Sequence, residues 1–584
     1  MNGDGKLTRL RVGIVGAGPA GLAAAILLKQ KGVEATIFER RGGTCSLPQA
    51  HVVNTRTSEI LREMGLFEAM TAAAAPAHKL RWITWSDSLA GVQFGQLPYQ
   101  GSPEQFAVRQ RSSPAWTLNI AQDKLEGMLY EGLATLGGSV CFGHHVINAI
   151  PAGKAAVLTI RTHDGMERSE TFDYVLACDG ANSTVRKALA IEMEGPASLA
   201  RFASAYFTAN LDKFLGERSG PVHFIAGPDF RGALIGFDLA TTWAVMCVMP
   251  ADASPAEFST DVMRELIRRA VGDPDLKLEL MGVGSWNMSA QVAVEFARGP
   301  FFLVGDAAHR FPPTGGLGLN TGVQDAHNIA WKLAFVQQGW ANQKLLDSYA
   351  LERRPVALRN RDHSLSNALR MVEVDDAIGA STLAPIDPAV VSRPPAPSVA
   401  HVLQTNSSES KAKRRRIQSA IEDQRAHFDS LDMEIGYQYD PANSKYDRTH
   451  VTHTYQPIVA LGGLLPHFYL NTSDGVTSSL DVLSNTGFTL FVGSKGRRWE
   501  EAACDVFERR GGLKVVRIDM SAKLDRDWRS ITGTQFEGGL LVRPDGHIAW
   551  RELGAMTDAG KEALERAAQD ILGTDLIARA YDET

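Results

Sequence analysis

Cysteine is scarce in this chain, and the spacing of its cysteines argues against a dithiol redox site and against a cysteine-based metal site. The 584 residues include five cysteines, none of which forms a CxxC pair or a Cys/His pattern with metal-ligand spacing. An odd number of widely separated thiols also argues against a disulfide framework. We therefore expect reduced thiols, no bound metal and a cytoplasmic location.

An excess of basic residues is missing as well, and so is a long apolar run. The net charge is −6, whereas a general nucleic-acid binder needs a basic surface. The apolar stretch 12–28 is interrupted by Gly16, Gly18, Pro19 and Gly21, which favours strand, turn and helix over a signal peptide. No other stretch has the length and apolar character of a membrane span, so no membrane partner is expected.

The remaining composition is that of a large globular protein. Hydrophobic residues make up 44% of the chain and charged residues 22%, which are ordinary values. A chain of 584 residues exceeds the usual size of one domain, so several domains are expected.

The first 40 residues contain the pattern of a dinucleotide-binding unit. A strand at 11–15 leads into G-x-G-x-x-G at 16–21, then a helix at 22–31 and a second strand at 33–38. The glycines allow a tight turn, close approach of a pyrophosphate, and close packing of helix on strand. Glu39 follows the second strand, where a carboxylate binds adenosine ribose hydroxyls. The residues predicted to contact the dinucleotide here are Gly16, Gly18, Pro19, Ala20, Gly21, Glu39 and Arg40.

A second glycine-rich stretch lies far downstream, at 301–331. A buried strand at 301–304 ends in Gly305 and Asp306, and a loop with several glycines precedes a helix that is expected to begin near Asn320. Unpaired N–H groups of such a loop suit a phosphate or an electron-rich ring carbonyl; the alternative is an ordinary strand–loop–helix connection. A second site of this kind favours FAD over NAD(P), because the flavin end extends far from the adenine.

Three shorter features lie between these two stretches. A buried strand ends in Asp179–Gly180, which could serve a cofactor or be a simple turn. Arg56 opens a helix and could reach a phosphate or be solvated, and Gln122 begins another helix at 121–136. His51 is ambiguous from the residues alone, since a lone histidine is more often structural.

Residues 190–295 have the alternation of an antiparallel sheet. Such a sheet between cofactor-binding segments could form one wall of a substrate pocket, although most of its aromatic side chains should be core. The pocket candidates are His223, Phe224, Arg231, Phe237 and Trp243.

The rest of the chain predicts helices, a linker and a separate domain. A helix at 345–354 is expected to end at Pro355, and residues 380–410 are rich in Pro, Ala and Ser. The basic run 411–416 is interpreted as a solvated helix start. From 488 onward the order β-α-β-β-β-α predicts a thioredoxin-like fold, but Cys504 stands alone there, so no dithiol chemistry is expected.

Three of these motifs together resemble one family. Gly16-x-Gly18-x-x-Gly21, Asp179–Gly180 and Gly305–Asp306 are similar to the three fingerprints of the flavin-dependent aromatic hydroxylases, the group of para-hydroxybenzoate hydroxylase. Residues 541–551 (LVRPDGHIAWR) and 427–440 resemble the phenol and dichlorophenol hydroxylase branch. The resemblance implies FAD, NADPH (or NADH) as co-substrate, O₂, a small aromatic substrate and a homodimer. The implied reaction is ortho-hydroxylation of a phenol through a flavin C4a-hydroperoxide, as in aromatic hydrocarbon catabolism.

The resemblance also implies roles for individual residues. Asp306 would hold the ribityl chain, Pro313 would lie over the flavin, and His51 would accept the phenol proton. Arg231 joins His51 and Pro313 as a predicted catalytic residue, and His223, Phe237 and Trp243 are predicted to bind substrate. The remaining predicted FAD contacts are Arg56, Gln122, Asp179, Gly180, Gly316, Gly318, Leu319 and Asn320.

The predicted fold class is α/β, with a Rossmann-type FAD-binding domain, an inserted antiparallel-sheet substrate domain and a C-terminal thioredoxin-like domain. Two other functions stay open: hydroxylation of a larger polyketide-type aromatic, and a flavin-binding reductase or inert flavoprotein. The predicted segments are 1–190 and 296–380 for FAD, 191–295 for the substrate sheet, 381–455 for a linker with a helix, and 456–584 for the C-terminal domain.

Overall fold

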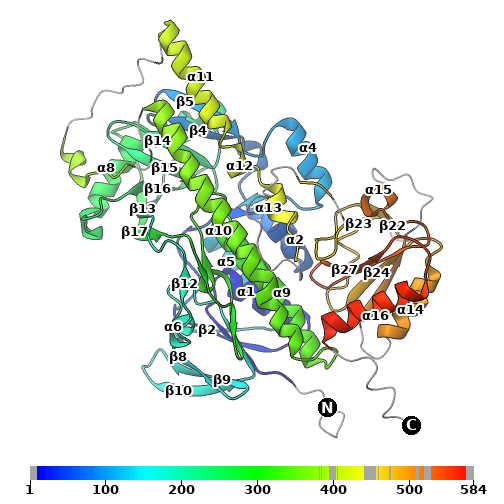
Figure 1. Ribbon diagram of the computed structural model, residues 1–584. Helices are drawn as coiled ribbons and strands as arrows, with labels where there is room; N and C mark the ends of the chain where they lie inside the picture. Colours follow the sequence, from blue (N-terminus) through cyan, green and yellow to red (C-terminus); the bar gives the residue numbers. More distant parts are fainter. Residues whose placement is uncertain are drawn as a thin grey trace, which may run out of the picture.

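The structure is a computed structural model (Figure 1). It describes residues 9–379, 382, 384–393, 403, 405–439, 455–457, 459–472, 475–507, 512–518 and 528–573. Much of the predicted linker at 380–410, and all of 440–454, lies outside the described residues. Among the described residues, no helix has the length and apolar character needed to cross a bilayer.

A six-stranded sheet organises the part of the chain that carries the three motifs. Its strand order is β19-β20-β11-β1-β2-β7, and its pairs are parallel except β19–β20. All four residues of β1 are buried, as expected for a parallel strand that is covered on both faces. The strands are β1 (Val12–Val15), β2 (Ala35–Glu39), β7 (Val140–Phe142), β11 (Tyr174–Ala177), β19 (Ala297–Arg298) and β20 (Phe301–Leu303).

The parallel pairing brings the three motifs to one edge of this sheet. Val15 lies opposite Ala177, which in turn lies opposite Leu303. The loops that follow these three residues therefore meet at the carboxyl ends of adjacent strands, where open α/β sheets bind ligands. Helix α1 (Pro19–Gln30) and helix α9 (Gly318–Gln337) pack against each other beside this edge.

The second large sheet has seven strands, and it includes residues from outside the predicted range 191–295. Two of its strands come from residues 82–98, because β4 pairs in parallel with β14 and β5 closes the edge. In sheet order the strands are β17 (Glu279–Met288), β13 (Ala200–Thr208), β16 (Thr242–Val248), β15 (Arg231–Gly236), β14 (Val222–Ala226), β4 (Trp82–Ser86) and β5 (Gln93–Pro98).

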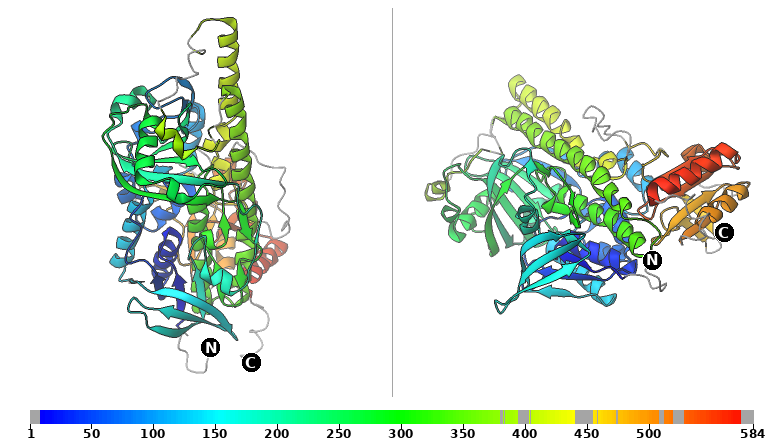
Figure 2. Two further views of the ribbon diagram at one scale, coloured as in Figure 1. Left: turned by 90° about the vertical axis from the view of Figure 1, so that its left-hand side faces the viewer. Right: turned by 60° about the horizontal axis from the view of Figure 1, so that its bottom comes forward.

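Helix α10 (Lys344–Ile378) spans the molecule, and the prediction that it ends at Pro355 is wrong. Its first turn contributes Leu345 to the core of the C-terminal part, and its last turns contribute Val374 and Ile378 to the core beneath the seven-stranded sheet. Figures 1 and 2 show the helix as a long green rod between these two parts. Pro355 is tolerated because tertiary packing on both sides outweighs the lost backbone hydrogen bond.

The C-terminal part contains a four-stranded sheet of order β25-β24-β26-β27. The β24–β25 pair is parallel and the other two pairs are antiparallel. Helices α14 (Arg497–Phe507) and α16 (Asp558–Leu572) contact each other and cover one face. The strands are β24 (Phe488–Val492), β25 (Leu513–Arg517), β26 (Gly539–Val542) and β27 (Ile548–Glu552).

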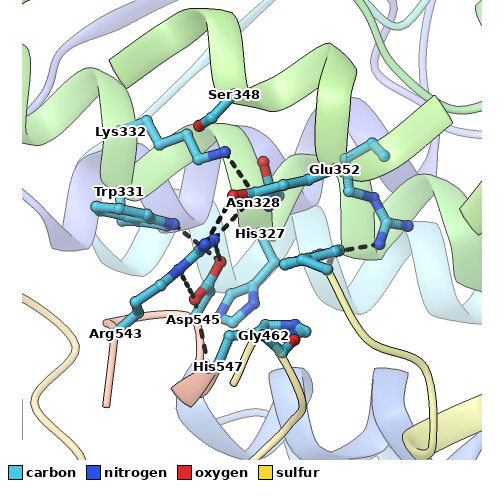
Figure 3. A network of polar contacts seen from close by, with 12 residues as sticks. His327, Asn328, Trp331, Lys332, Ser348, Glu352, Gly462, Arg543, Asp545 and His547 are labelled. Atoms are coloured by element: carbon cyan, nitrogen blue, oxygen red, sulfur yellow. Dashed lines mark hydrogen bonds and ion pairs between the residues drawn. The ribbon is translucent and has the colours of Figure 1, made fainter. Parts of the chain in front are cut away.

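A buried network of charges fastens the C-terminal part to helices α9 and α10 (Figure 3). Arg543 donates to both oxygens of Glu352, at 2.7 and 2.9 Å, and to Asp545 at 2.6 Å. Lys332 also donates to Glu352, at 2.7 Å, and the Trp331 indole donates to Asp545 at 3.0 Å. These ionic groups are buried or nearly so, so each charge depends on its partners.

The protein is expected to lose stability as the pH falls from about 4.5 to about 2. Burial alone would raise the pKa of Glu352, but Arg543 and Lys332 outweigh it and hold that pKa at about 2. Glu63 behaves in the same way, with a pKa of about 2, because of Lys31 and His327. Since both folded-state pKa values lie below the ordinary value of 4.5, their stabilisation is complete above that value and is lost as the pH falls through the folded pKa.

Each of these carboxylates accounts for about 3 kcal/mol of the free energy of unfolding that is lost in acid, at ~1.36 kcal/mol per pKa unit. Urea unfolding followed by tryptophan fluorescence at several pH values between about 6 and 2 measures it. Glu63→Gln and Glu352→Gln should flatten the acid slope. An unchanged slope in both variants would contradict this assignment.

Candidate functional site

Of the three glycines in the G-x-G-x-x-G loop, one has room for an added β-carbon and the other two have none. A Cβ on Gly16, where φ is +97°, would lie 2.4 Å from the Cys178 carbonyl oxygen, and one on Gly21 would lie 2.0 Å from the Gly16 oxygen. A Cβ on Gly18 would meet no protein atom closer than 4.0 Å. Gly16 and Gly21 therefore serve the fold, while Gly18 keeps a space open above the N-terminus of α1.

Glu39 is held beside this loop by backbone groups. It accepts hydrogen bonds from the N–H of Ala17 at 2.8 Å and of Arg41 at 2.9 Å. Burial alone would raise the pKa of Glu39, but these hydrogen bonds and the Arg41 guanidinium lower it, so the carboxylate is ionised. Arg40, a predicted FAD contact, is exposed, whereas the next residue, Arg41, contacts Glu39 at 3.0 Å.

A buried carboxylate that the sequence analysis missed lies next to this group. Glu126, in helix α5 (Gln122–Thr135), accepts from the Cys45 N–H at 2.7 Å and from Arg41 at 3.3 Å. The predicted residue Gln122 donates to the same carboxylate at 2.8 Å. The spacing of four residues between Gln122 and Glu126 was the available signal, since such pairs face each other on a helix.

The loop at 315–320 is joined to the segment that carries His51. The Asn320 amide donates to the carbonyls of Val52 at 2.9 Å and Gly316 at 2.6 Å, and it accepts from the Asn54 N–H at 2.9 Å. Gly315 and Gly316 both have positive φ. Helix α9 begins at Gly318, so the first N–H groups of this helix belong to the loop.

His51 lies between this loop and the seven-stranded sheet. Its Nδ1 is 2.6 Å from the Asn119 Oδ1, and its ring meets the Phe237 ring edge-on with centroids 5.7 Å apart. Burial lowers the pKa of His51, and the Asn119 contact offsets part of that effect, so the neutral ring predominates. Nε2 has no hydrogen-bond partner among the residues that the structure describes.

One further side chain near Phe237 was not predicted from the sequence. The ring of Tyr206, in β13, lies 6.4 Å from that of Phe237. Burial raises the pKa of Tyr206, and the nearby Cys45 thiol adds to the shift. The alternation along β13 places Tyr206 on one face of the strand, but the residues that surround it depend on which strands pair with β13.

The other predicted substrate residues are buried in the packing of the sheet, which argues against their predicted contact with substrate. His223 is fully buried and bonds to Thr84 at 2.7 Å and to the Gly220 carbonyl at 3.0 Å. Its ring lies 6.4 Å from that of Trp243, which is also fully buried. Both residues therefore belong to the core of the sheet, with Phe224 stacked on Trp85 at 5.1 Å.

Arg231 also lies away from His51. It begins β15, whereas Phe237 directly follows the other end of that strand. Six residue steps of about 3.3 Å separate them by roughly 20 Å. The predicted catalytic role of Arg231 does not fit this geometry.

Comparison with known proteins identifies the family. A family model described as FAD binding domain matches residues 9–364, and one described as aromatic-ring hydroxylase, C-terminal, matches residues 459–574. The chain belongs to the FAD-dependent aromatic-ring hydroxylases. As a member of this family, it is a monooxygenase that uses FAD as its cofactor and NAD(P)H as its co-substrate.

The similarity to individual members of these hydroxylases extends over nearly the whole chain. A 2,4-dichlorophenol 6-monooxygenase of Cupriavidus pinatubonensis (strain JMP 134 / LMG 1197) is 30% identical, with 96% of each chain covered. A putative polyketide hydroxylase of Streptomyces halstedii is 31% identical, with 93% of each covered. The crystal structure of the flavin-dependent monooxygenase PieE, in complex with FAD and substrate, has a TM-score of 0.88 at 29% identity, covering 97% of this chain and 100% of that one.

Two carboxyl groups at the sheet edge, on Asp306 and Asp179, suit the FAD of such hydroxylases. Asp306 is exposed, yet protein surrounds it closely enough that desolvation raises the pKa of its carboxyl. One oxygen of Asp179 is buried without a hydrogen-bond partner in the described part of the chain, and burial raises the pKa of Asp179 as well. The spare acceptor capacity of these carboxyl oxygens matches the hydroxyls of a dinucleotide, and the open Gly18 and Gly180 leave room for its phosphates.

Arg56 differs from the prediction that it contacts a phosphate. Its guanidinium donates to Glu59 at 2.8 Å and to the Asp545 carbonyl at 2.7 Å. Burial would lower the pKa of Arg56, but Glu59 and other anionic groups raise it above its ordinary value. The charge is already paired at the boundary with the C-terminal part, which argues against a phosphate contact.

Gly18→Ala is expected to fold normally and to bind FAD roughly tenfold or more weakly. The added methyl meets no protein atom closer than 4.0 Å, but it occupies the space through which a pyrophosphate approaches. Quenching of flavin fluorescence measures the affinity, and circular dichroism measures the fold. Gly127→Ala is the matched control, because a Cβ there meets nothing within 4 Å and lies in the middle of helix α5. Wild-type affinity in Gly18→Ala would exclude a close cofactor contact at this glycine.

Proposed function

We propose that the protein hydroxylates a phenolic ring next to its hydroxyl group, with NADPH and O₂ as co-substrates. The observation that carries this proposal is the position of His51 between the 315–320 loop and Phe237. Its Nε2 has no hydrogen-bond partner among the residues that the structure describes. A neutral imidazole with one unshared nitrogen suits a proton acceptor. The relatives named for chlorophenol and phenol point to the same substrate class.

The bound FAD supplies the electron transfer and the oxygen chemistry. The residues of the chain supply the rest. The proton of the phenol hydroxyl moves to His51 Nε2, which leaves a phenolate and an imidazolium. The ring of the phenolate is richer in electrons than that of the phenol and is therefore the better nucleophile toward an electrophilic oxygen. Phe237 and Tyr206 provide apolar surface beside His51, which orients an aromatic ring and excludes water.

We propose the following residues as FAD contacts; they are the ones predicted from the sequence, without Arg40 and Arg56. The loop from 313 to 320 would face the flavin ring, and the N–H groups at the start of α9 would stabilise negative charge on it. The proposed contacts are Gly16, Gly18, Pro19, Ala20, Gly21, Glu39, Gln122, Asp179, Gly180, Asp306, Pro313, Gly316, Gly318, Leu319 and Asn320.

The C-terminal part is proposed to be a thioredoxin-like domain spanning 456–584, without redox activity. The strand order β25-β24-β26-β27 with one parallel pair supports that fold, and Cys504 is the one cysteine of this segment. A homodimer and a cytoplasmic location stay predictions; sedimentation at several concentrations tests the first.

A second candidate is hydroxylation of a larger polyketide-type aromatic. The similarity to a putative polyketide hydroxylase favours it. The same histidine would serve a phenolic ring of a polycyclic substrate, so the two candidates differ in substrate size rather than in chemistry.

A substrate panel tests the proposal. NADPH consumption by the FAD-loaded protein is followed with single-ring phenols and with polycyclic phenols, while H₂O₂ and product mass are measured. A simple phenol that speeds oxidation and gains one oxygen atom, with little H₂O₂, would support the first candidate. Response to polycyclic phenols alone would favour the second, and oxidation that is never stimulated would contradict both.

A further inference from the structure

Asn119 is a buried amide held rigidly at the centre of the candidate site. It ends the short strand β6 (Leu118–Asn119), which pairs with β3 (Val52–Val53). Its own carbonyl accepts from the Ala75 N–H at 2.8 Å, and the next N–H, of Ile120, donates to the His51 carbonyl at 2.8 Å. Asn119 is fully buried, so its amide has little freedom to turn.

Two carbonyl groups determine which way this amide faces. Its Nδ2 donates to the carbonyls of Gly236 at 3.0 Å and Phe237 at 2.6 Å. A carbonyl only accepts, so the NH₂ group must face these two oxygens, and Oδ1 must face His51. An amide oxygen also only accepts, so the His51 Nδ1 that lies 2.6 Å away must carry a proton.

We infer that Asn119 is a positioning residue that holds His51 in the tautomer with its proton on Nδ1 and its lone pair on Nε2. This inference rests on the proposed function, in which Nε2 takes the phenol proton. Without Asn119 the neutral ring could place its proton on Nε2 and lose its capacity to accept one there. The same amide ties the backbone at Phe237 to His51, so it fixes the base relative to the aromatic ring beside it.

A double-mutant cycle tests the positioning role. Asn119→Leu keeps a similar volume but removes the acceptor, and its kcat for hydroxylation should fall roughly ten- to hundredfold with a much smaller change in KM. In a His51→Ala background the same substitution should cost little more, because both act through one group. Asn148→Leu, on strand β8 (His145–Ala152) of a separate sheet, is the matched control. An equal loss with and without His51 would mean a merely structural role and would overturn the inference.

A second measurement does not depend on activity. Nitrogen NMR of protein labelled in its histidines, with the His51 signals identified by their loss in His51→Ala, reports the tautomer directly. The expected result is a neutral ring protonated on Nδ1 near pH 7 in the wild type, and a mixture of tautomers in Asn119→Leu. A wild-type ring protonated on Nε2 would overturn the inference whatever the kinetics show.

The two measurements separate this inference from the proposed function. If the wild type hydroxylates no phenol but carries the Nδ1 proton, and Asn119→Leu shows a mixture of tautomers, the proposed function fails and the positioning by Asn119 stands. If hydroxylation occurs and Asn119→Leu retains wild-type kcat and tautomer, the proposed function stands and the inference fails.

Discussion

Replacement of His51 by alanine is expected to lower kcat for hydroxylation by about 10²- to 10⁴-fold, the usual contribution of a general base. The reason is that, among the described residues, His51 is the titratable side chain that contacts both Asn119 and the Phe237 ring. NADPH oxidation should continue in the variant, with oxygen diverted to H₂O₂, since the cofactor motifs are untouched. Product mass and H₂O₂, measured together across pH, test this expectation.

His78→Ala is the control for that experiment, because His78 is exposed and lies outside the candidate site. It should retain the wild-type rate. Hydroxylation by His51→Ala at the wild-type rate at every pH would show that His51 is not the base. A phenol with a lower pKa should be less sensitive to the substitution, since less of its proton transfer depends on the histidine.

Glu352→Ala is expected to lower the free energy of unfolding by about 3–5 kcal/mol, the usual cost of breaking a buried ion pair by removing one partner. The substitution leaves Arg543 and Lys332 without the carboxylate that both contact. Burial already lowers the pKa of Lys332 to about 8 despite Glu352, so the ammonium is desolvated. Urea unfolding measures the change.

Glu167→Ala provides the comparison, because the Arg161–Glu167 pair is about half exposed at both ends. Its effect should stay below about 1 kcal/mol. Replacing Lys332, Glu352 and Arg543 together by methionine, combined with Asp545→Asn, should cost much less than Glu352→Ala, since none of these four buried charges is then left without its partners. A Glu352→Ala effect no larger than that of Glu167→Ala would mean that the network in Figure 3 does not fasten the C-terminal part.

The sequence by itself determined the family, the cofactor and the strand–loop–helix units that carry the three glycine motifs. Those units are local: β1, the loop at 16–21 and α1 follow one another within a few residues, and the requirement for glycine at 16 and 21 comes from backbone clashes. Parallel pairing of strands with such loops brings their ends to one edge. For that reason the order of motifs was sufficient to predict FAD and a mixed α/β fold.

The tertiary structure alone decided which side chains surround His51 and which do not. Asn119 and Tyr206 reach His51 and Phe237 because β3 pairs with β6 and β13 pairs with β16, contacts between residues far apart in the sequence. The same long-range packing directs Arg56 toward Asp545 and puts His223 and Trp243 in the core. Alternation along a strand identifies a face, but strand pairing and register determine its neighbours. The sequence therefore predicted His51 as the candidate base, but it could not predict Asn119 as the positioning residue, because Asn119 reaches His51 only through these non-local contacts.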